Sequence, residues 1–238
     1  VGDRSRRWGR STGWISSVTS AVREYLFVLA LRSFRRWSPA HIQQIPSFCD
    51  TIARKSNGFI YAHLLMDGSL YRCARSSGRN NDQRFYYSGR KCFHGVNLIA
   101  LISPNGMFER VYGPYPASTT DKQIFNLENI GDELTNLHDC FVRLQRRPRV
   151  VADGGFATHR ELHGPIVYHN NDPDAPAFRA HNLIYSRIRI PNEWGFGRVS
   201  NLWRGLDMVD QMLPNLSSPS QLIIVSIFMT NLLTCVQG

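Results

Sequence analysis

The chain has 238 residues, of which 42% are hydrophobic and 19% are charged, and its formal net charge at pH 7 is +10. This length accommodates one ordinary domain with a sizeable core, and the composition excludes an intrinsically disordered chain. Such a basic protein favours a polyanionic partner, so we expect nucleic acid, and DNA first, as its partner.

Five cysteines occur in the chain, and no two of them form a CxxC pair. This pattern argues against a disulfide scaffold or a cysteine zinc site and fits a reducing compartment, the cytosol or the nucleus. The start at Val1 lacks an initiator Met and resembles no signal peptide, so we expect a fragment. Polar residues interrupt the apolar stretch Leu222–Val236, which predicts a buried helix and no membrane span.

Residues 1–57 predict a small helical segment. Apolar residues recur at three- and four-residue steps over Ser11–Leu31, and Ser38-Pro39 begins a second helix that runs to Arg54. The turn Trp8-Gly9-Arg10-Ser11 is compatible with a helix-turn-helix whose first helix lies upstream, although a plain amphipathic helix explains it equally well. We therefore expect 1–57 to be a helix-turn-helix remnant and linker, and 58–238 to be the main domain.

The main domain begins with strands and then alternates strands with helices. We predict a strand over 59–66 that ends at Asp67-Gly68, a hairpin of 95–102 and 107–112, and a break in the sheet at 113–116. A helix follows from Asp121, and then come strands at 149–152 and 165–168, a helix over 177–206 that Pro191 kinks or restarts, and a last helix from Pro219. This order predicts an RNase H-like α/β fold, a mixed sheet flanked by helices.

Four carboxylates occupy special places in this scheme. Asp67 and Asp153 end strands, Asp121 opens a helix and Glu193 lies on the long helix. Acids at the tips of neighbouring strands converge in space, and hard cations such as Mg²⁺ prefer their oxygens. Two divalent ions can stabilise both oxygens of a phosphodiester under attack. The alternative is that each acid is a turn residue, a helix cap or an ion-pair partner.

Six short motifs, spread in order over most of the chain, together resemble the DDE superfamily endonuclease domain of PIF/Harbinger transposases. They are Asp67-Gly68-Ser69, the segment from Phe85 through Arg90-Lys91 to His94, Pro116–Asp121, Asp153–Phe156, Arg189–Gly197 and Met229-Thr230-Asn231. The chain departs from the family pattern at Ser69, Ala117, Gly154 and Thr230, and none of these changes removes a carboxylate.

The resemblance implies a DNA endonuclease or transposase that uses Mg²⁺ or Mn²⁺ and acts in the nucleus. Asp67, Asp153 and Glu193 would be the catalytic triad and metal ligands, with Asp121 as a fourth metal ligand. Arg90, Lys91 and His94 would contact the DNA phosphates, with a sheet-edge basic cluster as the alternative. Sequence recognition would belong to the N-terminal segment or to a separate DNA-binding partner protein, and a homo-oligomer is compatible with this scheme.

Two other classes of function stay open. A transposase-derived protein with a decayed site would bind DNA or a partner without cutting, and an RNA-directed RNase H-like enzyme would cut hybrids. His159 and His163 flank Glu161 with a spacing that departs from a HExxH zinc motif, so we expect a polar helix face there.

Overall fold

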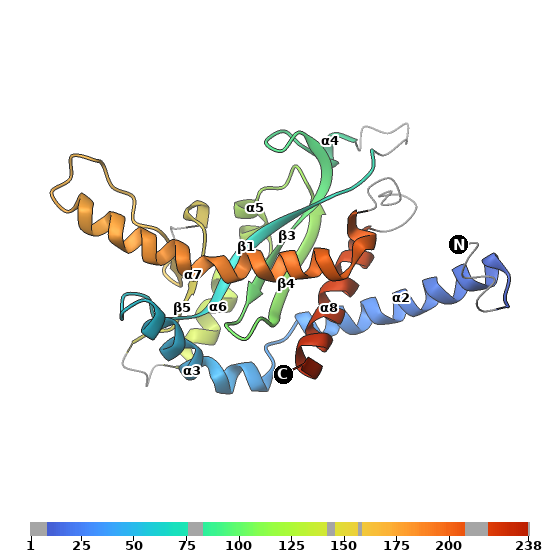
Figure 1. The fold of residues 1–238 in the computed structure, drawn as a ribbon, viewed down its shortest axis with the longest axis horizontal. Coiled ribbons are helices and arrows are strands. Elements are labelled where there is room, and N and C mark those ends of the chain that lie inside the picture. Colours follow the sequence, from blue (N-terminus) through green and yellow to red (C-terminus); the bar gives the residue numbers. More distant parts are fainter. Residues whose placement is uncertain (1–8, 76–82, 142–145, 157–158, 208–218, 238) are drawn as a thin grey trace.

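The computed structural model describes residues 9–75, 83–141, 146–156, 159–207 and 219–237 (Figure 1). Its helices are α2 (Thr12–Phe34), α3 (Pro39–Lys55), α4 (Gln83–Tyr86), α5 (Asp121–Leu127), α6 (Ile130–Asp139), α7 (Ala175–Leu202) and α8 (Pro219–Gln237), with 3-10 turns η1 (Gly154–Phe156) and η2 (Arg204–Asp207). Its strands are β1 (Ala62–Arg72), β2 (Tyr87–Ser88), β3 (Phe93–Ile102), β4 (Phe108–Pro116), β5 (Arg149–Val151) and β6 (Leu162–His163).

The strands form one mixed sheet in the spatial order β4-β3-β1-β5-β6, and β2 adds a short pairing to one end of β3. β3 runs antiparallel to both of its neighbours, β1 and β4, whereas β5 and β6 join β1 in parallel. Three antiparallel strands followed by two parallel strands reached through helices form the sheet of an RNase H-like fold. The predicted fold class is confirmed.

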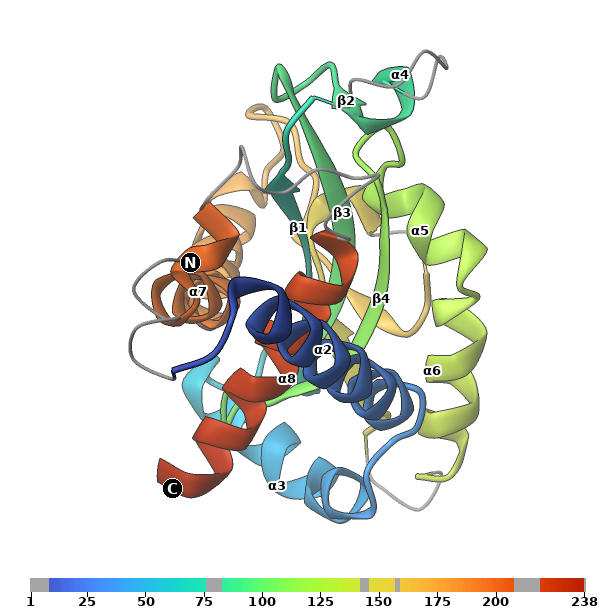
Figure 2. The same cartoon turned by 90° about the vertical axis from the view of Figure 1, so that its right-hand side faces the viewer.

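Helices cover both faces of this sheet (Figure 2). α5 and α6 pack on one face, and α7, α8 and α2 pack on the other. β3 serves both cores: its residues alternate between a cluster shared with α2, α7 and α8 and a cluster shared with α5 and α6. A strand buried on both faces has a continuous apolar sequence, which is the pattern of residues 96–102.

Two predicted strand ends were wrong. β1 continues past Asp67 to Arg72, because β3 still pairs with it after β5 has ended. β4 continues through the predicted break to Pro116, since it is an edge strand that bonds only to β3, and a proline without an N–H is tolerated there.

Pro191 does not divide the long helix. α7 runs from Ala175 to Leu202 through it, and Pro191 is exposed, so water can reach the carbonyl that loses its hydrogen bond. The last strand was predicted at 165–168, but β6 lies at Leu162–His163, where it pairs with β5. The helix starts at Ser11, Ser38, Thr120 and Pro219 are confirmed by the structure.

The N-terminal helices pack on the sheet. Ala30 and Phe34 of α2 belong to the core beside β3 and α8, and α3 contacts β1. The helix-turn-helix interpretation depends partly on Trp8, which lies outside the described residues, and the boundary at residue 57 stays a prediction.

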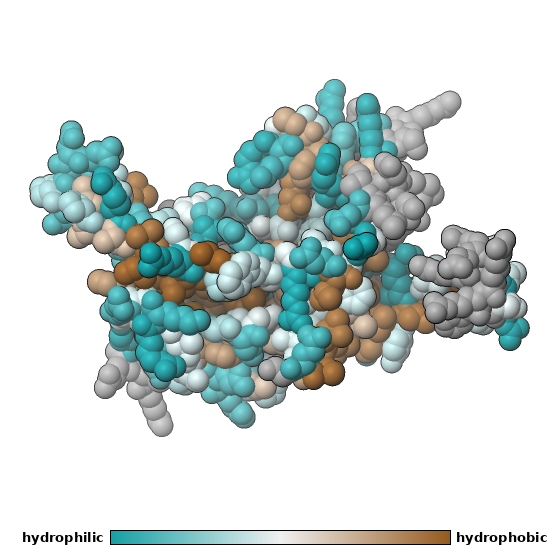
Figure 3. All heavy atoms as spheres, in the orientation of Figure 1, coloured by the Kyte–Doolittle hydropathy of each residue, from teal (hydrophilic) through white to brown (hydrophobic). Residues whose placement is uncertain are grey.

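α2 and α8 are both long and apolar enough to span a membrane by length and composition alone. α8 instead buries Ile223, Ile224 and Ile227 in the core, as predicted for this segment. α2 keeps Val22 and Tyr25 at its surface, and apolar side chains show as brown patches over both helices (Figure 3).

A buried amide on α8 fastens this helix to the sheet. Asn231 Oδ1 accepts from the N–H of Phe108 at 2.9 Å, and its Nδ2 donates to the carbonyl of the same residue at 2.8 Å. Both backbone groups belong to the first residue of β4, so this side chain fixes where the hairpin meets α8.

Replacing Asn231 with Leu should destabilise the protein, because it leaves two buried backbone groups unpaired at about 1–3 kcal/mol each. Urea unfolding followed by circular dichroism would measure the loss. Asn201→Leu is the matched control, because Asn201 is exposed on α7. Equal unfolding midpoints for the two variants would contradict this role of Asn231.

Candidate active site

Asp67 and Asp153 occupy matching positions at the same end of two neighbouring strands. β1 and β5 are parallel with Leu65 opposite Val151, and each acid follows two residues later. Arg189 of α7 reaches both of them: its guanidinium nitrogens lie 3.5 Å from Asp67 Oδ1 and 3.3 Å from Asp153 Oδ1. The structure therefore brings two predicted acids together around one cation.

The pKa of Asp67 reflects the charged groups around it. Burial raises the pKa of Asp67; Arg189 and the N–H of Gly68 oppose the rise, while the charges of Asp153 and Asp121 add to it. A half-buried carboxyl whose pKa is raised beside other acids is typical of a functional site. A cation beside the Asp67 carboxylate would stabilise its charged form in place of the water that burial removes.

Local contacts fix the second acid. The N–H of Gly154 donates to Asp153 Oδ1 at 2.6 Å. The hydroxyl of Tyr185 on α7 donates to the carbonyls of Ala152 and His163. The end of β5 is thus held against α7 where Asp153 leaves the sheet.

Glu193 lies one helical turn beyond Arg189 on α7. Its side chain is exposed, and the structure gives it no contact with Asp67 or Asp153. It is on the same side of the sheet as they are, but it does not complete their cluster.

Asp121 approaches from the opposite face of the sheet. Its Oδ1 accepts from Nδ2 of Asn97 at 2.7 Å, on the α5 side of β3. Its carboxylate also lies over Gly68: a Cβ at that position would fall 2.6 Å from Asp121 Cγ. Only glycine allows this approach, and it brings Asp121 close enough to act on Asp67 through space.

Among the described residues, no three His, Cys, Asp or Glu side chains lie close enough to hold a metal ion. In this arrangement Asp67 and Asp153 share Arg189, Asp121 bonds to Asn97, and Glu193 points to solvent. The metal-ligand assignment of these four acids stays a prediction.

A cavity of about 480 Å³ opens beside Gly68 and Asp121. Arg90 and Lys91, two of the predicted DNA contacts, line it, together with Ser69. His94 is not among its lining residues and instead stacks at an angle against Tyr87, with ring centroids 5.2 Å apart. Two predicted DNA contacts therefore share a cavity with Asp121 on the α5 side.

A family model described as DDE superfamily endonuclease matches residues 66–231. This range covers most of the chain, including Asp67, Asp121, Asp153, Glu193 and Asn231, and the chain therefore belongs to the DDE superfamily endonucleases. No curated protein and no solved structure matches the chain.

Two residues near the acids were not predicted from the sequence to belong to the site. Arg189 stands four positions before Glu193, so its helical spacing was the signal that could have found it. Asn192 is fully buried on α7, and neither of its amide atoms has a hydrogen-bond partner among the described residues. No sequence signal indicates that this asparagine faces the interior.

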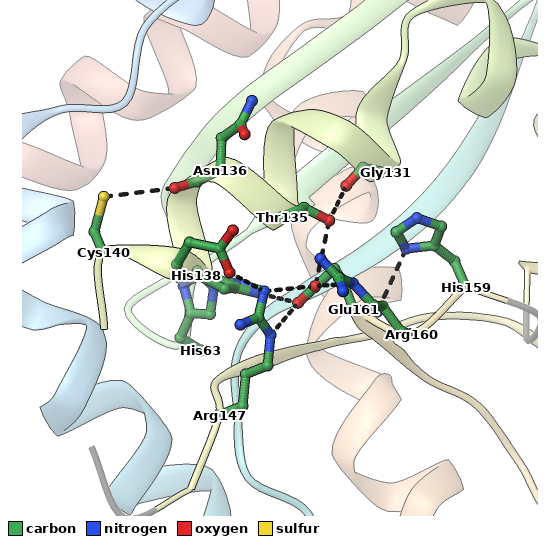
Figure 4. Close-up of polar contacts among 11 residues, drawn as sticks. His63, Gly131, Thr135, Asn136, His138, Cys140, Arg147, His159, Arg160 and Glu161 are labelled. Carbon is green, nitrogen blue, oxygen red and sulfur yellow. Dashed lines mark hydrogen bonds and ion pairs between the residues drawn. The ribbon is translucent and has the colours of Figure 1, made fainter. Parts of the chain in front are cut away.

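The His159–His163 segment is not the polar helix face that we predicted, because it forms a turn and β6. Its Glu161 is fully buried and ends a chain of hydrogen bonds through three histidines, of which His138 and His63 appear in Figure 4. His138 Nδ1 lies 2.6 Å from Glu161, His63 lies 2.8 Å from His138, and His41 lies 3.1 Å from His63. We call these four residues the histidine relay, and it links α3, β1, α6 and the start of β6.

Glu161 is ionised within this relay. Burial alone would raise its pKa, but hydrogen bonds from Arg147 and His138 lower it to about 2. An ionised carboxylate only accepts, so His138 Nδ1 carries the proton and its Nε2 accepts from His63. His63 in turn accepts from His41, whose Nδ1 lies 3.2 Å from a carboxylate oxygen of Glu109.

Acid should weaken the fold through this relay. Burial lowers the pKa of His63 well below its usual value, with His138 and His41 adding to the shift, and burial also lowers that of His138. In the unfolded chain His63 and His138 bind protons below about pH 6.5, whereas in the folded chain they stay neutral. The stability that these two histidines contribute is therefore fully present above that pH and is lost as the pH falls below it. At pH 5 the loss reaches at most about 2 kcal/mol per histidine held neutral.

Urea unfolding at pH 7.5 and pH 5 would measure this. We expect His63→Gln to be less stable at pH 7.5 and to lose less stability on acidification than the wild type. His169→Gln, a change at an exposed histidine, serves as the control and should keep the wild-type pH dependence. An unchanged pH dependence in His63→Gln would show that the relay does not carry the effect.

Proposed function

We propose that this chain is a divalent-metal-dependent DNA endonuclease of the transposase type, with Asp67, Asp153 and Glu193 as its catalytic acids. The observation that carries the proposal is Arg189, whose guanidinium lies between the carboxylates of Asp67 and Asp153. Two acids from neighbouring strands that share one cation form a site where negative charge needs compensation.

The donor chemistry at this end of the sheet suits Mg²⁺ or Mn²⁺. Carboxylates from two strand ends supply hard oxygen ligands, and Glu193 lies one helical turn from the residue that already reaches both. A bound divalent ion, or a pair of them, would polarise the phosphate and lower the pKa of an attacking water. Asp121 would support the same site from the α5 face through its charge on Asp67.

The chain's own side chains would place the DNA. Arg90 and Lys91 line the cavity beside Gly68 and Asp121, where a phosphate backbone entering the site would pass, and His94 lies on the neighbouring β3. Such contacts hold the backbone without recognising bases. Sequence recognition would then fall to the N-terminal segment or to a separate partner protein.

Arg189 occupies the position that a divalent ion would compete for. Replacing it with Gln removes the competing cation, so we expect tighter Mn²⁺ binding by isothermal titration and a larger rise in melting temperature on adding Mn²⁺. Arg187→Gln is the matched control, because Arg187 is exposed on the same helix and makes no ion pair with the acids. Equal Mn²⁺ affinity in both variants would show that no ion binds between Asp67 and Asp153.

Plasmid nicking in Mg²⁺ or Mn²⁺ tests the activity. Asp67→Asn, Asp153→Asn and Glu193→Gln should each slow nicking by at least about 100-fold, because metal-borne charge stabilisation contributes several kcal/mol and each 1.36 kcal/mol is a tenfold rate. Asp174→Asn, a change at an exposed acid at the start of α7, should nick at the wild-type rate. Wild-type nicking in all three acid variants would refute the assignment.

A second candidate is a transposase-derived protein that binds DNA without cutting it. The specific observation in its favour is again Arg189, which neutralises Asp67 and Asp153, while Glu193 stays outside the cluster. This candidate predicts no metal-dependent nicking by the wild type and no gain of Mn²⁺ binding in Arg189→Gln.

Within the superfamily we place the chain with the PIF/Harbinger group, on the six motifs described above. Action on chromosomal DNA would locate it in the nucleus, and a homo-oligomer would allow both ends of an element to be handled together.

A further inference from the structure

A second cavity, of about 290 Å³, lies at the other end of the sheet from the acids. Its lining combines two aromatic residues with four basic ones: Phe59, Tyr61, Arg146, Arg147, Arg149 and His163. Tyr61 precedes β1 and Asp67 lies six residues further, which at about 3.3 Å per residue is roughly 20 Å. No residue of this cavity belongs to the candidate active site.

The charge of the cavity comes from Arg146 and Arg149. Arg147 is already neutralised, because its guanidinium donates two hydrogen bonds to Glu161, at 3.0 and 2.7 Å, and lies 2.8 Å from Asp139. Neither Arg146 nor Arg149 has a carboxylate within ion-pair distance in the described part of the chain. Burial lowers the pKa of His163 to about 4, with His181, Arg149 and Arg146 adding to the shift, so this imidazole is neutral at pH 7.

The cavity also carries a partly exposed aromatic surface, although Phe59 contacts His181 edge to face with ring centroids 6.1 Å apart. Phe59 is 55% exposed, although a phenyl ring gains from burial. The guanidinium of Arg146 lies 5.3 Å from the Tyr61 ring centroid and donates to the carbonyl of Gly58 at 2.8 Å. The cation is thereby held beside the Tyr61 ring, and Glu161 of the histidine relay fixes Arg147 (Figure 4).

We propose that this cavity binds an unpaired nucleotide of a DNA strand, with its phosphate between Arg146 and Arg149 and its base on Phe59. Guanidinium groups recognise phosphate oxygens through paired donors, and exposed aromatic rings beside a basic groove are the platforms on which single-stranded bases stack. The volume lies near the lower bound of about 300 Å³ for small-ligand sites, which fits one nucleotide unit. Tyr61 lies roughly 20 Å from Asp67 along β1, while His163 pairs with Val151, two residues before Asp153, so this would be a site for strand flanking the cleavage point.

Fluorescence anisotropy with a labelled oligothymidylate, in EDTA, tests the site independently of metal chemistry and of nicking. The variant Arg146→Ala/Arg149→Ala should bind about tenfold more weakly, and its plot of log K against log salt should flatten by about 0.7, since the site holds one phosphate and each phosphate contact on a single strand contributes about 0.7. Phe59→Ala should weaken binding without changing the salt slope, because it removes stacking and no charge. Arg32→Ala/Arg204→Ala, which removes two exposed arginines from α2 and η2, is the matched control.

Thermal melting of each variant checks the fold, and Arg149→Ala alone, with an expected slope change of at most about 0.7, replaces the double variant if Arg146 proves structural. The proposal is overturned if the double variant and its control lose affinity and slope equally, or if the loss is the same for a duplex of matched length. Competition by a polyglutamate peptide or by free nucleoside monophosphates as effective as that by the oligonucleotide would also overturn it. Because the assay runs in EDTA, its outcome does not depend on the proposed nuclease activity.

Discussion

The contact of Arg189 with Asp67 and Asp153 is the constraint on which the functional end of the molecule depends. Two carboxylates at the ends of adjacent parallel strands repel each other, and burial makes that repulsion stronger. A cation must lie between them, and α7 supplies one from the side chain that faces the sheet. The geometry of α7, and hence the position of Glu193, is tied to that ion pair.

The sheet explains why these acids can meet at all. β5 ends at Val151, two residues before Asp153, while β1 continues along β3 for several more residues. Within the described residues, β5 therefore leaves one edge of β1 unpaired beyond Val151. Asp67, Gly68 and Ser69 lie along this part of β1 and are half-buried. Asp121 uses the same opening from the other face, and it can do so only because residue 68 has no side chain.

The opposite end of the sheet has a different chemistry. There Glu161 holds Arg147 and terminates the histidine relay, which crosses from α3 through β1 to α6. Buried polar chains of this kind are stable only when every member is satisfied, so they specify one arrangement of the elements that they join. The basic cavity of Phe59, Arg146 and Arg149 lies next to this rigid part.

The sequence by itself determined the element types, the RNase H-like order, the helix starts at Ser11, Ser38 and Thr120, and the family resemblance, because periodicity, caps and local motifs are properties of neighbouring residues. It could not find Arg189, the face that Asp121 occupies, or the burial of Glu161, because each follows from contacts between residues far apart in the chain. Strand ends also escaped it: β1 passes Asp67 and β4 passes Gly113 because pairing with β3 continues there. Tertiary structure decided these points, since a strand ends where its partner ends and a charge lies where its counter-charge can reach it.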